Sequence, residues 1–213
     1  MPIAWDDEAR GHLATIEANL LEVLRGLVAE ASAGRPPSVA AACEWHRTIY
    51  RDVPLPVDYF AGGIRDSDPA LPELNGYEVA VGDVPGVPSR EVPAALRRFE
   101  RELIRRLDQL EVLTAEGWTE RHVLLVLQVT AWVHGEWIRI HPFANGNGRI
   151  ARLWANWCAL RYGLPPFVRL RPRPQGLDYA MAALASMEGD HGPMVGAFAR
   201  MLEQSLAESA PGG

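Results

Sequence analysis

The chain lacks one amino acid completely, since all 21 of its basic residues are arginine and none is lysine. A P-loop needs a lysine beside the nucleotide phosphates, a protein kinase needs one on a strand, and a pyridoxal enzyme needs one for its Schiff base. All three classes are therefore excluded. Any phosphate chemistry in this protein must use arginine side chains and backbone N–H groups.

Cysteine is also scarce, and the two residues present, Cys43 and Cys158, lie far apart. This excludes a disulfide-rich scaffold and a cysteine zinc site, and it is typical of the reducing cytoplasm. The first eight residues show no signal-peptide pattern, and the most apolar stretch, 123–133, is well short of the ~20 residues that cross a membrane. We therefore expect a cytoplasmic protein without a membrane partner.

Positive charge is in deficit, because 27 acidic residues give the chain a net charge of −6. This balance lacks the basic footprint of a nucleic-acid-binding protein, so no nucleic-acid partner is expected. Hydrophobic residues make up 48% and charged residues 23%, which excludes general disorder. The length of 213 residues predicts a single domain, residues 1–213.

Apolar residues recur at helical spacing along most of the chain. With the proline and glycine breaks, this pattern predicts helices over 6–33, from 38 to before 54, and over 92–110, 119–140, 145–162, 177–187 and 193–206. The segment 53–93 has loop composition, and within it residues 77–81 predict a strand that faces 86–88 across a turn. We therefore predict an all-α fold with one small β-hairpin, and a functional role for this long loop.

The sequence His141-Pro142-Phe143-Ala144-Asn145-Gly146-Asn147-Gly148-Arg149 stands out for its chemistry. A long apolar helix is expected to stop before Pro142, because proline disfavours a helical conformation in the residue that precedes it. A new helix is expected to start within residues 145–148. Glycines there expose N–H groups, and together with the helix dipole these groups favour a bound phosphate.

Two arginines and one histidine surround this predicted phosphate site. Arg149 and Arg152 are three residues apart, so both project from one helix face, and each guanidinium can bind phosphate oxygens in bidentate fashion. His141 lies just before the site, where a neutral imidazole can take a proton from a hydroxyl. The set predicts nucleophilic attack on a nucleotide phosphate. The alternative, that His141 is only a hydrogen-bonded histidine at a helix end, does not account for these neighbours.

The segment resembles the signature of Fic proteins, His-Pro-Phe-x-(Asp/Glu)-Gly-Asn-Gly-Arg-x-x-Arg. It departs at one fixed position, where Asn145 replaces the acidic residue. The resemblance extends over about 38–198, most of the chain, and leaves 1–34 as an N-terminal helix. It implies a Fic-type helical bundle with its active-site loop at 141–149 and a hairpin flap that includes Val79, Ala80 and Val81.

The resemblance also implies a function, the transfer of AMP from ATP to a Tyr, Ser or Thr hydroxyl of a target protein. His141 would be the general base, Phe143 would anchor the loop in the core, and the flap would align the target as an added strand. Arg149 would pair with the β-phosphate and Arg152 with the γ-phosphate. The implied nucleotide-binding residues are Asn145, Gly146, Asn147, Gly148, Arg149 and Arg152.

Asn145 stands where the family holds Mg²⁺, so the resemblance implies Mg²⁺ as a cofactor. An uncharged amide attracts a divalent ion weakly, and we expect the metal to be weakly held. Three interpretations stay open: an enzyme of low activity, a degenerate domain that binds nucleotide with little turnover, and an enzyme that uses another phosphate-containing donor.

The N-terminal helix contains a candidate regulatory residue. Ile16-Glu17-Ala18-Asn19 loosely resembles the inhibitory Ile-Glu-Gly-Asn element of the family, in which the glutamate pairs with the second motif arginine. Glu17 is therefore a candidate inhibitory residue, and an exposed helix glutamate is the alternative. A homodimer and a separate inhibitor protein also stay open as regulatory partners.

Other conspicuous residues are interpreted as structural or solvated. No histidine pair has the spacing of a zinc site, so we assign structural or surface roles to His12, His46, His122, His134 and His191. Alternating arginines predict a solvated basic stretch at Arg169, Arg171 and Arg173. Helical spacing predicts a core position for Trp132, Trp137, Trp154 and Trp157.

Overall fold

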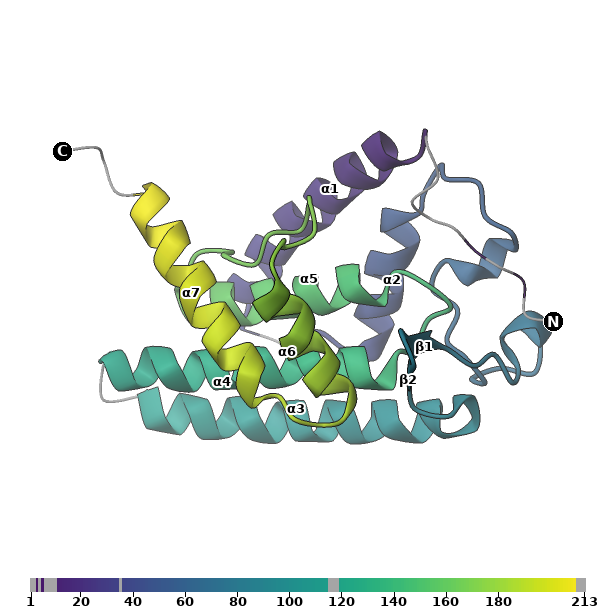
Figure 1. Cartoon of the computed structure of the whole chain (residues 1–213). Coiled ribbons are helices and arrows are strands. Elements are labelled where there is room, and N and C mark those ends of the chain that lie inside the picture. The colour runs from purple at the N-terminus through teal and green to yellow at the C-terminus, as the bar shows by residue number, and fades with distance from the viewer. Residues whose placement is uncertain (1–2, 4, 6–10, 35, 115–118, 210–213) are drawn as a thin grey trace.

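The computed structural model describes residues 3, 5, 11–34, 36–114 and 119–209, and it confirms the all-α class (Figure 1). The helices of this described part are α1 (Leu13–Ser32), α2 (Val39–Ile49), α3 (Val92–Thr114), α4 (Glu120–Ile140), α5 (Asn147–Arg161), α6 (Leu177–Met187) and α7 (Gly192–Ser209). Short 3-10 helices lie at Asp58–Phe60, Pro72–Leu74 and Ser89–Glu91. Within the described ranges, every helix is too short or too polar to span a membrane.

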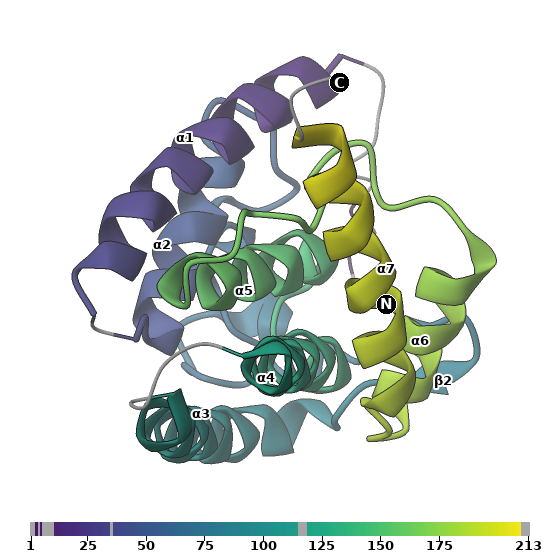
Figure 2. The same ribbon diagram turned by 90° about the vertical axis from the view of Figure 1, so that its left-hand side faces the viewer.

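Helices α4 and α5 form the centre of the bundle, as the end-on view of α4 shows (Figure 2). Helices α1 and α2 cover α5 on one side, α6 and α7 cover α4 on the other, and α3 lies along α4. The predicted tryptophan core is confirmed, because Trp137, Trp154 and Trp157 are fully buried and Trp132 is nearly so. The loop between α4 and α5 contacts this core, because the ring centroids of Phe143 and Trp137 lie 5.8 Å apart.

The predicted helix boundaries need correction mainly at the N-terminus. Helix α1 starts at Leu13, because Gly11 has a φ of +108° that a helix does not allow; the predicted helical residues 6–10 lie outside the described ranges. Ser38 accepts a hydrogen bond from the N–H of Ala41 and so caps α2. This helix ends at Ile49, earlier than expected. Asp52, with a φ of +61°, turns the chain there.

The predicted hairpin is present but smaller than expected. Strand β1 (Ala80–Val81) pairs antiparallel with β2 (Val84–Pro85), so the second strand precedes the predicted 86–88. Gly82 adopts a left-handed φ of +59° and allows this tight turn. The N–H of Val87 then donates to the carbonyl of Arg139 at 3.2 Å, which attaches the hairpin to the end of α4.

Candidate active site

The chain turns sharply where α4 ends. His141 caps this helix in the left-handed conformation, with φ 53° and ψ 56°, and Pro142 follows it. Few residues other than glycine adopt this conformation without support from their surroundings. The turn needs a partner that holds its backbone in place.

Arg65 supplies that support from the long loop. Its side chain is completely buried, and it donates hydrogen bonds of 2.8–3.0 Å to the carbonyl oxygens of Ile140, His141, Tyr77 and Val87. Burial lowers the pKa of Arg65 to about 10, so the guanidinium stays charged at neutral pH. Arg65 therefore joins the end of α4 to both ends of the flap.

His46 contacts the active-site loop on the side of the core. Its ring stacks on the buried ring of Phe143, with centroids 4.1 Å apart, which confirms that Phe143 anchors the loop. The N–H of Gly62 donates to Nδ1 of His46 at 2.8 Å, so Nε2 carries the proton and donates to the carbonyl of Asn145 at 3.0 Å. Burial lowers the pKa of His46 to about 3, which keeps this neutral form. His46 is structural, as the sequence predicts. Its contacts with the active-site loop do not follow from the sequence.

Gly146 connects the loop to α5, at a position with no room for a side chain. Gly146 has a φ of +76°, and a Cβ atom there would lie 2.6 Å from the Tyr50 hydroxyl and 2.8 Å from Nε2 of His46. The side chain of Asn147 bonds both the N–H and the carbonyl of Phe143, at 3.0 and 2.9 Å. Asn147 can thus offer a nucleotide its backbone N–H, while its amide keeps the loop closed.

His141 has the geometry of a general base. Its Nδ1 lies 2.9 Å from the carbonyl of Ile138, an acceptor, so Nδ1 carries the proton and Nε2 keeps its lone pair. Burial lowers the pKa of His141 to about 4, and the charge of Arg65 adds to this effect. The imidazole is therefore neutral at physiological pH and can accept a proton at Nε2.

Arg149 and Arg152 lie side by side on the first turns of α5, and both are 5% exposed. Arg149 donates to the Tyr50 hydroxyl at 2.9 Å, and Arg152 donates to the carbonyl of Leu170 at 3.3 Å. The two arginines face a cavity of about 300 Å³ that His141, residues 145–148 and Val81 also line. The structure thus brings the predicted base, the predicted nucleotide-binding residues and the flap together at one cavity.

Asn145, the one departure from the motif, is bonded at both ends of its amide. Its Nδ2 donates to the carbonyl of Trp5 at 2.9 Å, and its Oδ1 accepts from the N–H of Gly146 at 2.7 Å. The ring of Trp5 packs on Tyr50, with centroids 4.7 Å apart. An aspartate could not donate to Trp5, so asparagine is the residue that attaches this N-terminal segment to the loop.

The same cavity fits Mg²⁺ poorly. This metal prefers one or two carboxylates together with phosphate oxygens. The described residues that line the cavity contain no aspartate or glutamate, and both of their side-chain amide oxygens, those of Asn145 and Asn147, already accept hydrogen bonds. No cluster of three potential metal ligands occurs in the described part of the chain.

The predicted flap residues lie on strand β1 and immediately before it. Val79 accepts a hydrogen bond from the N–H of Gly86, Ala80 is exposed, and Val81 lines the cavity. Among the described strands β1 has β2 as its one neighbour, so its other edge is open to an added strand.

Glu17 lies near the site but pairs with a different arginine from the one expected. Its Oε1 is 3.3 Å from Nε of Arg171, and within the described ranges no ion pair joins it to Arg152. The side chain of Glu17 is 51% exposed. Any inhibitory action of Glu17 would therefore pass through Arg171.

The interpretation of 169–173 as a solvated stretch is wrong for Arg171, whose side chain is only 16% exposed. Arg171 and Arg173 both line the cavity, and Tyr179 of α6 joins them there. The hydroxyl of Tyr179 lies 2.9 Å from Nε2 of the buried His134. The alternating arginines can be recognised in the sequence. Their separation from the motif along the chain gives no indication that two of them reach the cavity.

Comparison with known proteins places these features in a family. Residues 36–159, more than half of the chain, match the model of the Fic/DOC family, and the chain belongs to this family. It is similar to the protein adenylyltransferase Fic of Culex quinquefasciatus, with 36% identity over 95 residues, which are 43% of this chain and 18% of that protein. The corresponding protein of Drosophila persimilis is 31% identical over 125 residues, 59% of this chain and 22% of that protein.

The chain therefore matches only about a fifth of the length of these relatives. A Fic-domain-containing signaling protein of Bacteroides thetaiotaomicron has a similar fold, with a TM-score of 0.58. The match covers 91% of this chain and 69% of that one, at 21% sequence identity. At this identity the likeness concerns the fold alone.

Proposed function

We propose that this protein transfers AMP from ATP to a Tyr, Ser or Thr hydroxyl of a target protein. The geometry of His141 carries the proposal, because its Nε2 keeps a lone pair and the residue lines the same cavity as the expected phosphate-binding residues. The imidazole takes the hydroxyl proton, the hydroxyl oxygen bonds to the α-phosphorus, and the α–β phosphoanhydride bond breaks. Arg149 and Arg152 stabilise the charge on the departing pyrophosphate. The names of the relatives support this reaction.

The flap has a positioning role in this proposal. The open edge of β1 binds an extended target segment by backbone hydrogen bonds, which brings its hydroxyl side chain toward His141. The proposed reaction does not use Mg²⁺, because the donors at the cavity fit this ion poorly.

Two labelled forms of ATP test the reaction. The protein is incubated with a cell lysate and either α-labelled or γ-labelled ATP, and the modified side chains are mapped by mass spectrometry. AMP transfer deposits the α-label on hydroxyl side chains and leaves the γ-label in pyrophosphate. Deposition of the γ-label instead would show phosphate transfer and contradict the proposal. Labelled UTP, GTP and CTP test for another nucleotide donor.

A second candidate function is nucleotide binding with little turnover, and the bonding of Asn145 favours it. Its amide is bonded to both Trp5 and Gly146 and adds no negative charge for a metal. ATP binding with no α-label on any protein would support this alternative.

A further inference from the structure

The cavity has a second set of arginines that the Fic motif does not include. Arg149 and Arg152 approach it from α5, whereas Arg171 and Arg173 approach it from the segment between α5 and α6. No carboxylate lies among its described lining residues. Four guanidinium groups thus line a cavity of about 300 Å³, and the part of its walls that the structure describes contains no acidic group.

This concentration of positive charge is only partly compensated within the described chain. Burial lowers the pKa of Arg152, and the charges of nearby Arg149 and Arg173 lower it further, although Tyr179 opposes them. The buried Nε of Arg152 has no hydrogen-bond partner among the described residues. Arg171 pairs with Glu17 at the rim, and no described carboxylate pairs with Arg173. A polyanion would supply the missing partners.

Arginine can neutralise a polyphosphate as a metal does. Its planar group donates two hydrogen bonds to phosphate oxygens and keeps its charge at all physiological pH values. A protein that binds Mg²⁺ with the phosphates places carboxylates around them, and these would repel the polyphosphate in the absence of the metal. This cavity has the opposite arrangement, since arginines stand on both sides and Asn145 is uncharged.

We propose that Arg171 and Arg173 are specificity-determining residues that bind the polyphosphate chain of the nucleotide and enable the site to bind it without a metal ion. The nucleotide part of this inference rests on the proposed function. The ligand class is a metal-free nucleoside triphosphate. Arg173 is exposed at the cavity, so it can reach an incoming phosphate without a change in the buried core.

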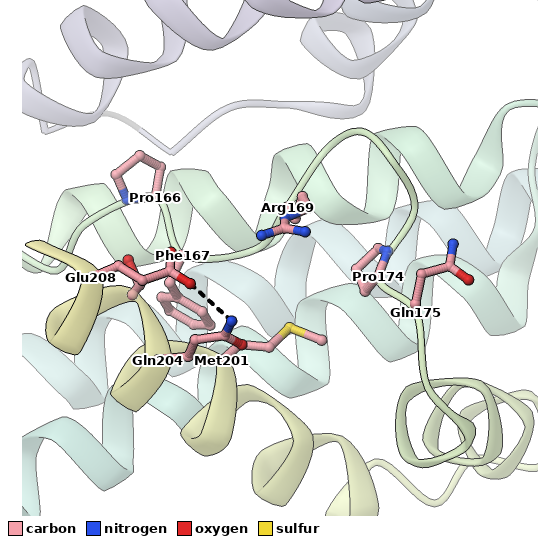
Figure 3. Close-up of a pocket in the computed structure, with 9 residues that line it drawn as sticks. Pro166, Phe167, Arg169, Pro174, Gln175, Met201, Gln204 and Glu208 are labelled. Carbon is pink, nitrogen blue, oxygen red and sulfur yellow. Dashed lines mark hydrogen bonds between the residues drawn. The ribbon is translucent and has the colours of Figure 1, made fainter.

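Arg169 provides a matched control from the same segment. It is exposed, and it lines a different cavity of about 470 Å³, together with Phe167 and residues of α7 such as Met201 and Gln204 (Figure 3). A glutamine at this position removes the same charge from the same loop, but away from the motif. An effect of general surface charge would appear equally in both variants.

The test is calorimetric titration of ATP into the full chain, once with excess EDTA and once with Mg²⁺. We expect wild-type affinities that agree within about threefold. Without metal, Arg173→Gln and Arg171→Gln should each weaken ATP binding by about tenfold or more, because each loses charge-assisted hydrogen bonds. Arg169→Gln should stay within twofold of wild type. AMP affinity should change little in all three variants, and inorganic tripolyphosphate should compete with ATP.

Several results would overturn the inference. Wild-type ATP binding that is more than tenfold weaker in EDTA would show a metal-dependent site. Wild-type affinity of the Arg173 and Arg171 variants, or an equal loss in Arg169→Gln, would remove the two arginines from the site. Thermal unfolding curves check that every variant is folded. The proposed function is judged separately, by α-label transfer in Mg²⁺: transfer with a metal-dependent site refutes only this inference, whereas metal-free binding without transfer refutes only the proposed function.

Discussion

Two walls enclose the cavity at the start of α5, and they are built differently. The motif wall, residues 141–152, is mostly buried, and the arginine wall, residues 169–173, reaches the cavity through an irregular loop. Arg65 and His46 bond the backbone of the first wall at His141, Pro142 and Asn145. The side chain of Arg171 pairs with Glu17. This difference indicates that catalytic groups need a fixed position, whereas side chains on a less rigid segment can still contribute to ligand affinity.

Replacement of His141 should have the largest effect, because the motif wall then loses its base. His141→Asn should slow α-label transfer by about 10²–10⁴-fold, while ATP affinity changes less than about threefold. Asparagine tolerates the left-handed backbone at this position, so the turn is kept. Transfer rates and calorimetric titration measure the two quantities. A variant that transfers AMP at the wild-type rate would remove His141 from the mechanism.

Replacement of Arg65 should destabilise the fold around the motif wall. Arg65→Gln leaves several buried carbonyl groups without donors, and the free energy of unfolding should fall by about 3 kcal/mol or more. The control is Arg47→Gln, which removes an exposed arginine paired with Glu44 and should cost less than about 1 kcal/mol. Urea unfolding measures both. Equal losses in the two variants would contradict the supporting role of Arg65.

Asn145→Asp tests the role of charge at the cavity, because it places a carboxylate between the two walls. Without metal, ATP affinity should fall by about tenfold, since the new charge repels phosphate and the bond to Trp5 is lost. With Mg²⁺, the new carboxylate ligand should raise the transfer rate above that of the wild type. A Mg²⁺ titration of rate and affinity tests this. If Asn145→Asp is no faster than the wild type at any Mg²⁺ concentration, the missing carboxylate at position 145 does not limit the transfer rate.

Glu17→Gln should act on the arginine wall alone. Removal of the half-exposed ion pair takes away an anion that competes with phosphate for Arg171, so ATP affinity should rise by about two- to threefold. Glu22→Gln is the control, because Glu22 lies on the same helix but pairs with Arg51, at 2.6 Å. Self-modification and ATP titration report the effect. Identical behaviour of Glu17→Gln and wild type would end the regulatory hypothesis.

The smallest effect is expected from pH. The pKa of His141 is lowered to about 4, so the imidazole is already the neutral base above about pH 5.5. The transfer rate should therefore change less than about twofold from pH 5.5 to 7.5 on the acidic limb, and fall only as the pH approaches 4. A rate profile over this range tests it. A fall centred near pH 6.5 would mean that the base is a solvated histidine.

The motif wall could be predicted because its parts are neighbours along the chain. Pro142 ends one helix, glycines start the next, and the spacing of Arg149 and Arg152 defines one helix face. These effects act within a few residues, so the sequence contains the whole argument. The helices, the hairpin and the tryptophan core followed from periodicity in the same way, with errors confined to boundaries and to the strand pairing of 86–88.

The supporting residues could not be predicted in this way. Arg65 is separated from His141 by 76 positions, and His46 from Asn145 by 99. Nothing local distinguishes a buried arginine with several carbonyl partners from an exposed one. The same holds for Asn145, whose bond to Trp5 connects residues 140 positions apart.

By itself, then, the sequence determined the helical class, the turn at His141 and the glycine-rich start of α5, because local sterics and hydrogen-bonding capacity decide these. Only the tertiary structure decided which residues complete the site. The segment after α5 returns over the motif wall and brings Arg171 and Arg173 to the cavity, while Arg169 lines another one. Long-range packing of helices sets that path, and a pattern of alternating arginines contains no information about it.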